Sequence, residues 1–73
     1  MKTFAVKHKT TYAHKLFIVA AESESVAVDL CMVAETEWDR TGTPHTPNAR
    51  EFEAELIDGV TSRKEGIKSI LYV

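Results

Sequence analysis

Apolar and polar residues alternate along the start of the chain in the way that is typical of a β-strand. Residues on one face of this segment are mostly apolar or aromatic: Phe4, Val6, His8, Thr10 and Tyr12. The alternation breaks around Ala13–His14 and resumes in residues 15–21, which predicts a hairpin with a tight turn. The second strand is apolar on both faces and therefore requires cover on both sides. One helix can cover only one of them.

A helix is predicted directly after this hairpin. Ser23 is a favourable N-cap, and Glu22 and Glu24 suit the positive end of the helix dipole. A broad apolar stripe at helical spacing predicts the side that faces the core: Val26, Ala27, Leu30, Cys31, Val33, Ala34 and Trp38. Val28 and Met32 fall outside that stripe, one turn apart. They are either scattered surface residues or a contact site.

Residues 39–50 contain a glycine and two prolines, so they cannot form one regular element and are predicted to be a long loop. Residues 51–58 alternate between glutamate and apolar residues as an edge strand would, although a helix beginning at Pro47 also fits. The strand is preferred because residues 67–73 form a convincing strand that needs a neighbour. A turn in residues 62–66 would join the two as a second hairpin.

The predicted fold is therefore α+β, a ββαββ arrangement with one helix packed on a face of an antiparallel sheet. Residues 1–73 offer room for a single small domain with a thin core. Cys31 is the sole cysteine, which excludes an intramolecular disulfide and a cysteine-rich zinc site. A core this small favours self-association. We therefore predict a homodimer that pairs either through the sheet face around Phe17 and Val19 or through Val28 and Met32.

The location of the protein is predicted from the same features. The chain starts with a strand pattern instead of an apolar leader, and its longest apolar run, residues 16–21, is too short to span a bilayer. A lone thiol fits a reducing compartment. The expectation is a cytoplasmic protein with no membrane contact.

Charge is sorted along the chain, although the formal net charge is only −2. Residues 1–21 contain four lysines and no acid, whereas residues 22–39 contain six acids and no lysine or arginine. Such sorting directs how partners approach. The leading hypothesis is a protein or nucleoprotein partner with a basic face, bound through Asp29, Glu35, Val28 and Met32. The alternative is nucleic acid bound by Lys7, Lys9 and Lys15 of the hairpin, which an isoelectric point near 5.9 disfavours.

No residue pattern indicates catalysis, a cofactor or a metal. The three histidines, His8, His14 and His45, lack the close spacing of most local metal sites. Cys31 lies on the predicted buried stripe, where a thiol behaves as a small apolar group. The glycines are too dispersed for a phosphate-binding loop. We therefore expect a protein that is not an enzyme and has no cofactor.

The junction between hairpin and helix follows the pattern Val-x-Ala-x-Ser-x-x-x-Ala, with Val19, Ala21, Ser23 and Ala27 at the fixed positions. In this respect residues 4–30 resemble the start of short phage- and plasmid-encoded accessory proteins of the DpnD/PcfM type. Small anti-CRISPR and other counter-defence proteins are built on similar hairpin–helix scaffolds. The resemblance implies a mobile-element origin and a role in inhibiting or modulating a host protein or nucleoprotein. It transfers no functional residue.

Overall fold

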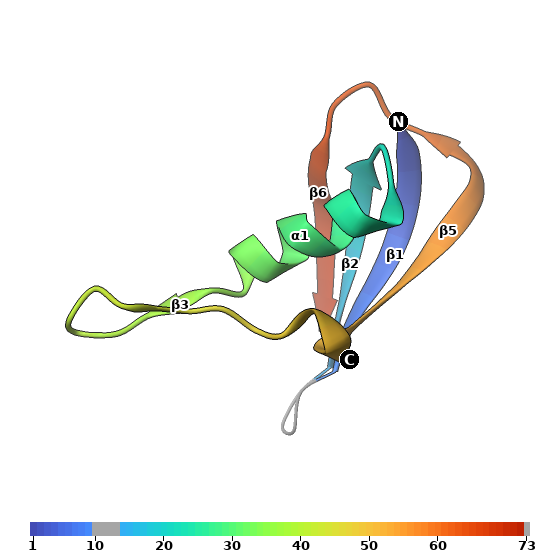
Figure 1. The fold of residues 1–73 in the computed structure, drawn as a ribbon. Coiled ribbons are helices and arrows are strands. Elements are labelled where there is room, and N and C mark those ends of the chain that lie inside the picture. Colours follow the sequence, from blue (N-terminus) through green and yellow to red (C-terminus); the bar gives the residue numbers. More distant parts are fainter. Residues whose placement is uncertain (10–13, 73) are drawn as a thin grey trace.

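The computed structural model describes residues 1–9 and 14–72 and packs one helix against one face of a four-stranded antiparallel sheet (Figure 1). The α+β prediction is confirmed. The strand order is β5-β1-β2-β6, and β1 pairs with β2 as the expected first hairpin. Its turn, with Thr10, Tyr12 and Ala13, lies outside the described residues. The elements of this body are β1 (Lys2–Lys9), β2 (His14–Ala21), α1 (Glu24–Ala34), β5 (Phe52–Thr61) and β6 (Gly66–Tyr72).

Helix α1 begins where the sequence predicts. The Ser23 side chain accepts a hydrogen bond from the backbone N–H of Val26, at 3.3 Å, and so caps the helix. At the other end, the Thr36 hydroxyl donates to the carbonyl of Met32 at 2.9 Å. Within the described residues, no helix is long and apolar enough to cross a membrane.

The core lies between α1 and the facing side of the sheet. It consists of residues that are at most 8% exposed: Phe4, Val6, Phe17, Val19, Ala21, Ala27, Cys31 and Phe52. The idea that the sheet face around Phe17 and Val19 pairs with a second copy is therefore wrong, because the helix covers both side chains.

The predicted helix stripe is also partly wrong. Val28 and Met32 pack against the core, whereas Val33 is 75% exposed and Trp38 is 68% exposed. Two physical reasons account for this. The helix presents the line through Ala27 and Cys31 to the sheet, which brings Val28 and Met32 inward and turns Val33 outward. The helix also ends at Ala34, so Trp38 belongs to another element.

The two C-terminal strands form as predicted, but they do not form a hairpin with each other. They pair with β1 and β2 at opposite edges of the sheet. Strand β5 bends near Gly59, whose φ of 78° is one that glycine readily adopts. The bend carries the chain across the end of the sheet, where Ser62 and Met1 exchange two hydrogen bonds of 3.0 and 2.7 Å. The turn in residues 62–66 thus connects strands at opposite edges of the sheet instead of two neighbouring strands.

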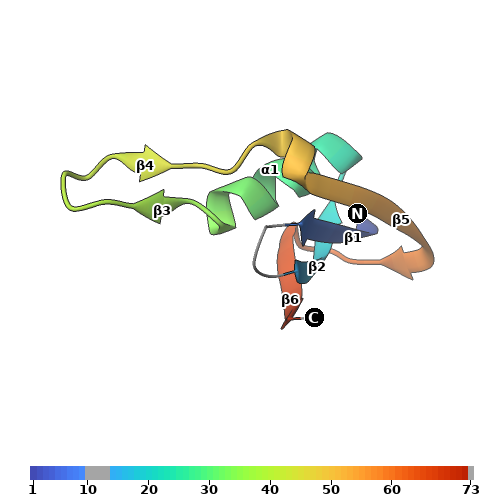
Figure 2. The same ribbon diagram turned by 90° about the horizontal axis from the view of Figure 1, so that it is seen from below.

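Residues 37–45 form a projecting hairpin, which we call the arm (Figures 1 and 2). It consists of β3 (Glu37–Trp38) paired with β4 (Pro44–His45), and it extends a molecule whose axes measure 42 × 23 × 19 Å. A short 3-10 helix, η1 (Ala49–Glu51), then leads into β5. The predicted loop over residues 39–50 therefore contains β4 and η1.

Candidate binding surfaces

An open groove lies between α1 and the start of β5, and we call it the acidic groove. Its volume is about 430 Å³. Glu24 and Asp29 are exposed at its rim, while Val28 and Phe52 provide apolar surface beneath them. The full lining comprises Glu24, Ser25, Val28, Asp29, Ala49 and Phe52. An apolar floor with carboxylates at its rim suits a cationic side chain that has an apolar stem.

The acidic groove brings together two of the four residues predicted to bind a partner, Val28 and Asp29. Met32 lies one turn further along α1 and packs against the core. Glu35 follows the end of the helix and has a side chain only 12% exposed. Glu24 was predicted only to suit the helix dipole, although its position one turn before Val28 on the same helix was a signal that the two share a face.

Glu35 holds two cationic partners within the fold. Its Oε1 accepts a hydrogen bond from Lys15 Nζ at 2.8 Å, and its Oε2 lies 3.0 Å from His8 Nδ1. The hydrogen bond to Glu35 raises the pKa of Lys15, against an opposing effect of burial. Glu35 is thus a structural ion-pairing residue, and the expectation that it stands free on the surface is wrong.

His8 is buried at 2% exposure and its ring stacks on Phe52 with centroids 4.2 Å apart. Its Nε2 has no hydrogen-bond partner in the described part of the chain, and the nearest carboxylate is Glu51 Oε1 at 3.5 Å. A histidine beside a carboxylate can serve as a general base. Here His8 lines a hollow of about 320 Å³ with Glu35 and Glu51, whose side chains are 12% and 41% exposed. The imidazole itself is buried between the two carboxylates and Phe52, so the arrangement supports the fold.

The Cys31 thiol is also unsuited to chemistry. Burial, followed by the negative charge of Glu35, raises its pKa to about 12, so the reactive thiolate is scarce at neutral pH. Across residues 1–9 and 14–72, no group of three histidine, cysteine or acidic side chains is placed to hold a metal ion.

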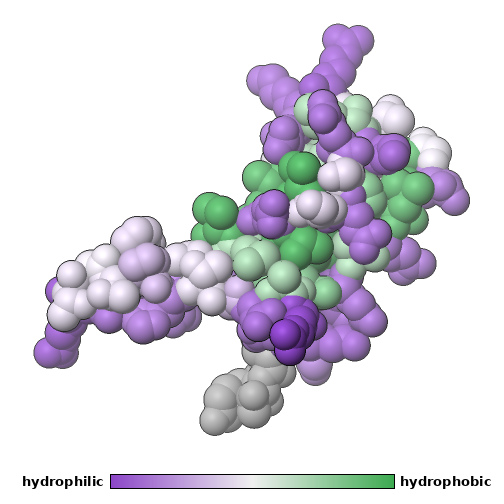
Figure 3. Space-filling view, viewed as in Figure 1, coloured by the Kyte–Doolittle hydropathy of each residue, from purple (hydrophilic) through white to green (hydrophobic). Residues whose placement is uncertain are grey.

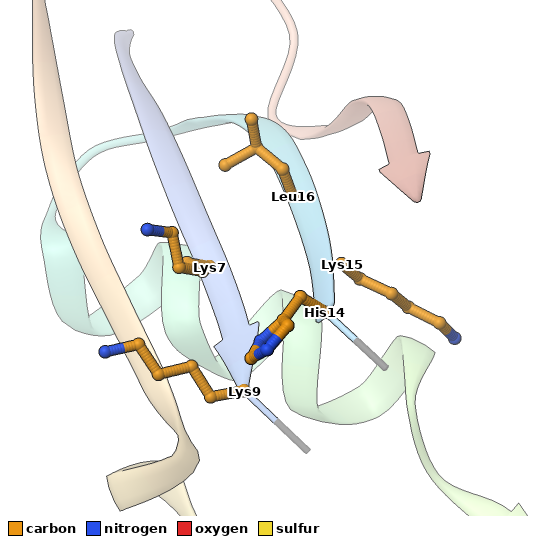
Figure 4. A pocket seen from close by; sticks show the side chains of 5 residues that line it. All are labelled: Lys7, Lys9, His14, Lys15 and Leu16. Carbon is orange, nitrogen blue, oxygen red and sulfur yellow. The ribbon is translucent and has the colours of Figure 1, made fainter. Parts of the chain in front are cut away.

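A second hollow, on the sheet face away from the helix, contains the basic residues of the hairpin (Figure 4). We call it the basic hollow. It has a volume of about 270 Å³ and is lined by Lys7, Lys9, His14, Lys15 and Leu16. Lys7 and Lys9 extend to the same side, as predicted, whereas Lys15 extends in the opposite direction toward Glu35. Two of the three residues predicted to contact nucleic acid in the alternative, Lys7 and Lys9, therefore lie together.

The arm is stiffened by its own hydrogen bonds. One oxygen of Asp39 accepts from the backbone N–H groups of Thr41 and Thr43, at 2.9 and 3.0 Å, and from the Thr41 hydroxyl at 2.7 Å. The other oxygen lies 3.0 Å from His45 Nε2. These interactions, led by the Thr41 hydroxyl, hold the pKa of Asp39 below its usual range. The arm thus presents Trp38, the sole tryptophan, on a pre-organised support.

Comparisons of this chain with protein-family models, with curated proteins and with solved structures find no match.

Proposed function

We propose that this protein is a non-enzymatic binding domain that docks a basic protein surface in the acidic groove. The observation that carries the proposal is the meeting of Val28, Asp29 and Glu24 around one hollow with an apolar floor. Long-range attraction between such a surface and a basic partner speeds association and sets orientation.

The groove fits a lysine or arginine side chain of the partner. Its methylene stem would lie on Val28 and Phe52, and its charged group would reach Glu24 and Asp29. Basic surfaces of this kind are common on proteins that hold nucleic acid. The proposed target is thus a host protein or nucleoprotein in the cytoplasm, inhibited or modulated by surface contact. The resemblance of residues 4–30 to mobile-element accessory proteins supports an anti-CRISPR or similar counter-defence role.

Charge reversal in the groove tests this proposal. Host proteins with basic faces can be enriched on heparin, and their binding to the immobilised protein can be measured at low and high salt. For a retained protein, Glu24→Lys with Asp29→Lys should lower affinity by about tenfold or more, mainly by slowing association, and should weaken the salt dependence. Both side chains are exposed, so the fold should persist.

The matched control is Asp58→Lys with Glu65→Lys, which makes the same change in net charge at exposed positions away from the groove. It should retain most of the affinity at physiological salt, because exposed charges are screened beyond about 8–10 Å. Equal losses in the two double variants, or no retained basic protein, would contradict the proposal.

Nucleic-acid binding at the basic hollow is the second candidate, favoured by the shared orientation of Lys7 and Lys9 beside Leu16. It ranks second because Lys9 Nζ already lies 3.1 Å from Glu53 Oε2. For this candidate, Lys7→Glu with Lys9→Glu should weaken binding of a single-stranded oligonucleotide by about tenfold or more. The slope of log affinity against log salt should fall by about 1.4 for two lost phosphate contacts.

Fluorescence anisotropy of a labelled oligonucleotide measures both quantities. Arg63→Glu with Lys64→Glu is the control, since it makes the same charge change in the turn between β5 and β6. If the control weakens binding as much as the hollow variant, the attraction is non-specific. Absence of binding at low salt would remove this candidate.

A further inference from the structure

The two edges of the described sheet differ in chemistry. The β5 edge carries exposed acids, a common protection against unwanted strand pairing. Strand β6 has a single charged residue, Lys68, which lies at a β-bulge near the start of the strand, and beyond the bulge it exposes Ile70 at 43%, Leu71 at 51% and Tyr72 at 75%. A strand edge with apolar side chains on both faces and little charge is suited to pairing with another strand.

Further apolar groups lie on the same side of the molecule. Figures 1 and 2 both show the arm extending from the end of α1, in the layer of the helix, past the position of β6. The arm carries Trp38, and the end of α1 nearest the arm carries Val33, 68% and 75% exposed. Figure 3 shows hydrophobic patches around α1, with hydrophilic side chains between them. Tryptophan and tyrosine are the residue types most enriched at the energetic centres of protein interfaces.

We propose that β6 pairs antiparallel with β6 of a second copy around a two-fold axis, extending the sheet across both molecules. This inference goes beyond the proposed function and uses a surface separate from the acidic groove.

A second copy of this chain fits the β6 edge because an antiparallel strand pair is self-complementary under two-fold symmetry. A register centred on Ile70 places Ile70 against its own symmetry mate. Leu71 then faces Ser69, and Tyr72 lies opposite the bulge at Lys68, which brings an ammonium group near an aromatic ring. The register brings no like charges together. Tyr72 already has the Lys15 ammonium 5.4 Å from its ring centre in the single chain.

The mass of the protein across a range of concentrations tests the dimer. Analytical ultracentrifugation should show monomer at low micromolar and dimer at high micromolar concentration, since one strand pair with few flanking groups makes a small interface. Ile70→Lys places two ammonium groups across the axis and should raise the dissociation constant by about tenfold or more. Leu56→Lys is the matched control on β5, at a position 47% exposed, and should leave the constant unchanged.

Cross-linking tests the register. Cys31 is buried, so Ile70→Cys introduces the most accessible thiol of the chain. Directly opposed Cα atoms in an antiparallel pair lie about 4.5–5.5 Å apart, within the reach of a disulfide. Mild oxidation should therefore convert Ile70→Cys to a covalent dimer far faster than it converts Leu56→Cys.

Three results would overturn the inference: monomer at every concentration, equal cross-linking of the two cysteine variants, or open-ended polymers. Polymers would indicate pairing of β6 with β5 instead. Because Ile70 lies outside the acidic groove, Ile70→Lys should bind a basic partner normally. A failed dimer and a failed binding function are therefore distinguishable.

Discussion

Replacing Phe17 by alanine is expected to lower the free energy of unfolding by about 3–5 kcal/mol. Phe17 is fully buried in β2, between its sheet neighbours Val6 and Ile70 and beneath α1. The substitution removes a large apolar side chain and leaves a cavity that a close-packed core fills only in part. For so small a domain, this is a large fraction of the total stability.

Urea denaturation followed by circular dichroism measures the change. Leu56→Ala is the control, because Leu56 is 47% exposed on the same sheet and should cost about 1 kcal/mol or less. A loss for Phe17→Ala as small as that of the control would mean that α1 does not cover β2.

The local alternation of apolar residues was sufficient to predict most of the elements. Strand β1, strand β2 and the Ser23 cap each depend on residues close in sequence, so short patterns identify them. The pairing of β5 and β6 depends on the whole chain. An alternating sequence shows that a strand needs a neighbouring strand without showing which strand that is. The bend at Gly59 has no distinctive sequence pattern, so the sequence does not reveal that the chain crosses to the other edge there.

The candidate binding surface was predictable only where its residues are close in sequence. Val28 and Asp29 are adjacent on one helix, so the sequence places them together. Glu35 finds its partners 20 and 27 residues away, at Lys15 and His8. The charge sorting seen along the chain is thus partly neutralised in three dimensions, where lysines of the hairpin meet acids of later segments. Lys9 and Glu53 form another such pair.

Reversing the charge of Glu35 is expected to be the most damaging single charge reversal in this protein. Glu35→Lys removes the carboxylate that holds Lys15 and His8 and places a third basic group beside them. Removing the acceptor of a partly buried, charged hydrogen bond costs about 1.5–3 kcal/mol, and the added positive charge repels Lys15. The loss in the free energy of unfolding should therefore be about 3 kcal/mol. Glu37→Lys makes the same charge change at an exposed neighbour and should stay within about 0.5 kcal/mol.

The dependence on pH separates the charge of Glu35 from its packing. Glu35→Gln keeps the shape of the side chain and removes the charge, so it should cost less than Glu35→Lys. Glu35 raises the pKa of Lys15 above its ordinary 10.5 in the folded protein. A raised pKa in the folded state gives stability that is fully present below the ordinary value and is lost as the pH rises through the folded value. The stability gap between the native protein and Glu35→Gln should therefore be wide at neutral pH and narrow in strong alkali. A gap that stays constant across that alkaline range would show that Glu35 acts through packing alone.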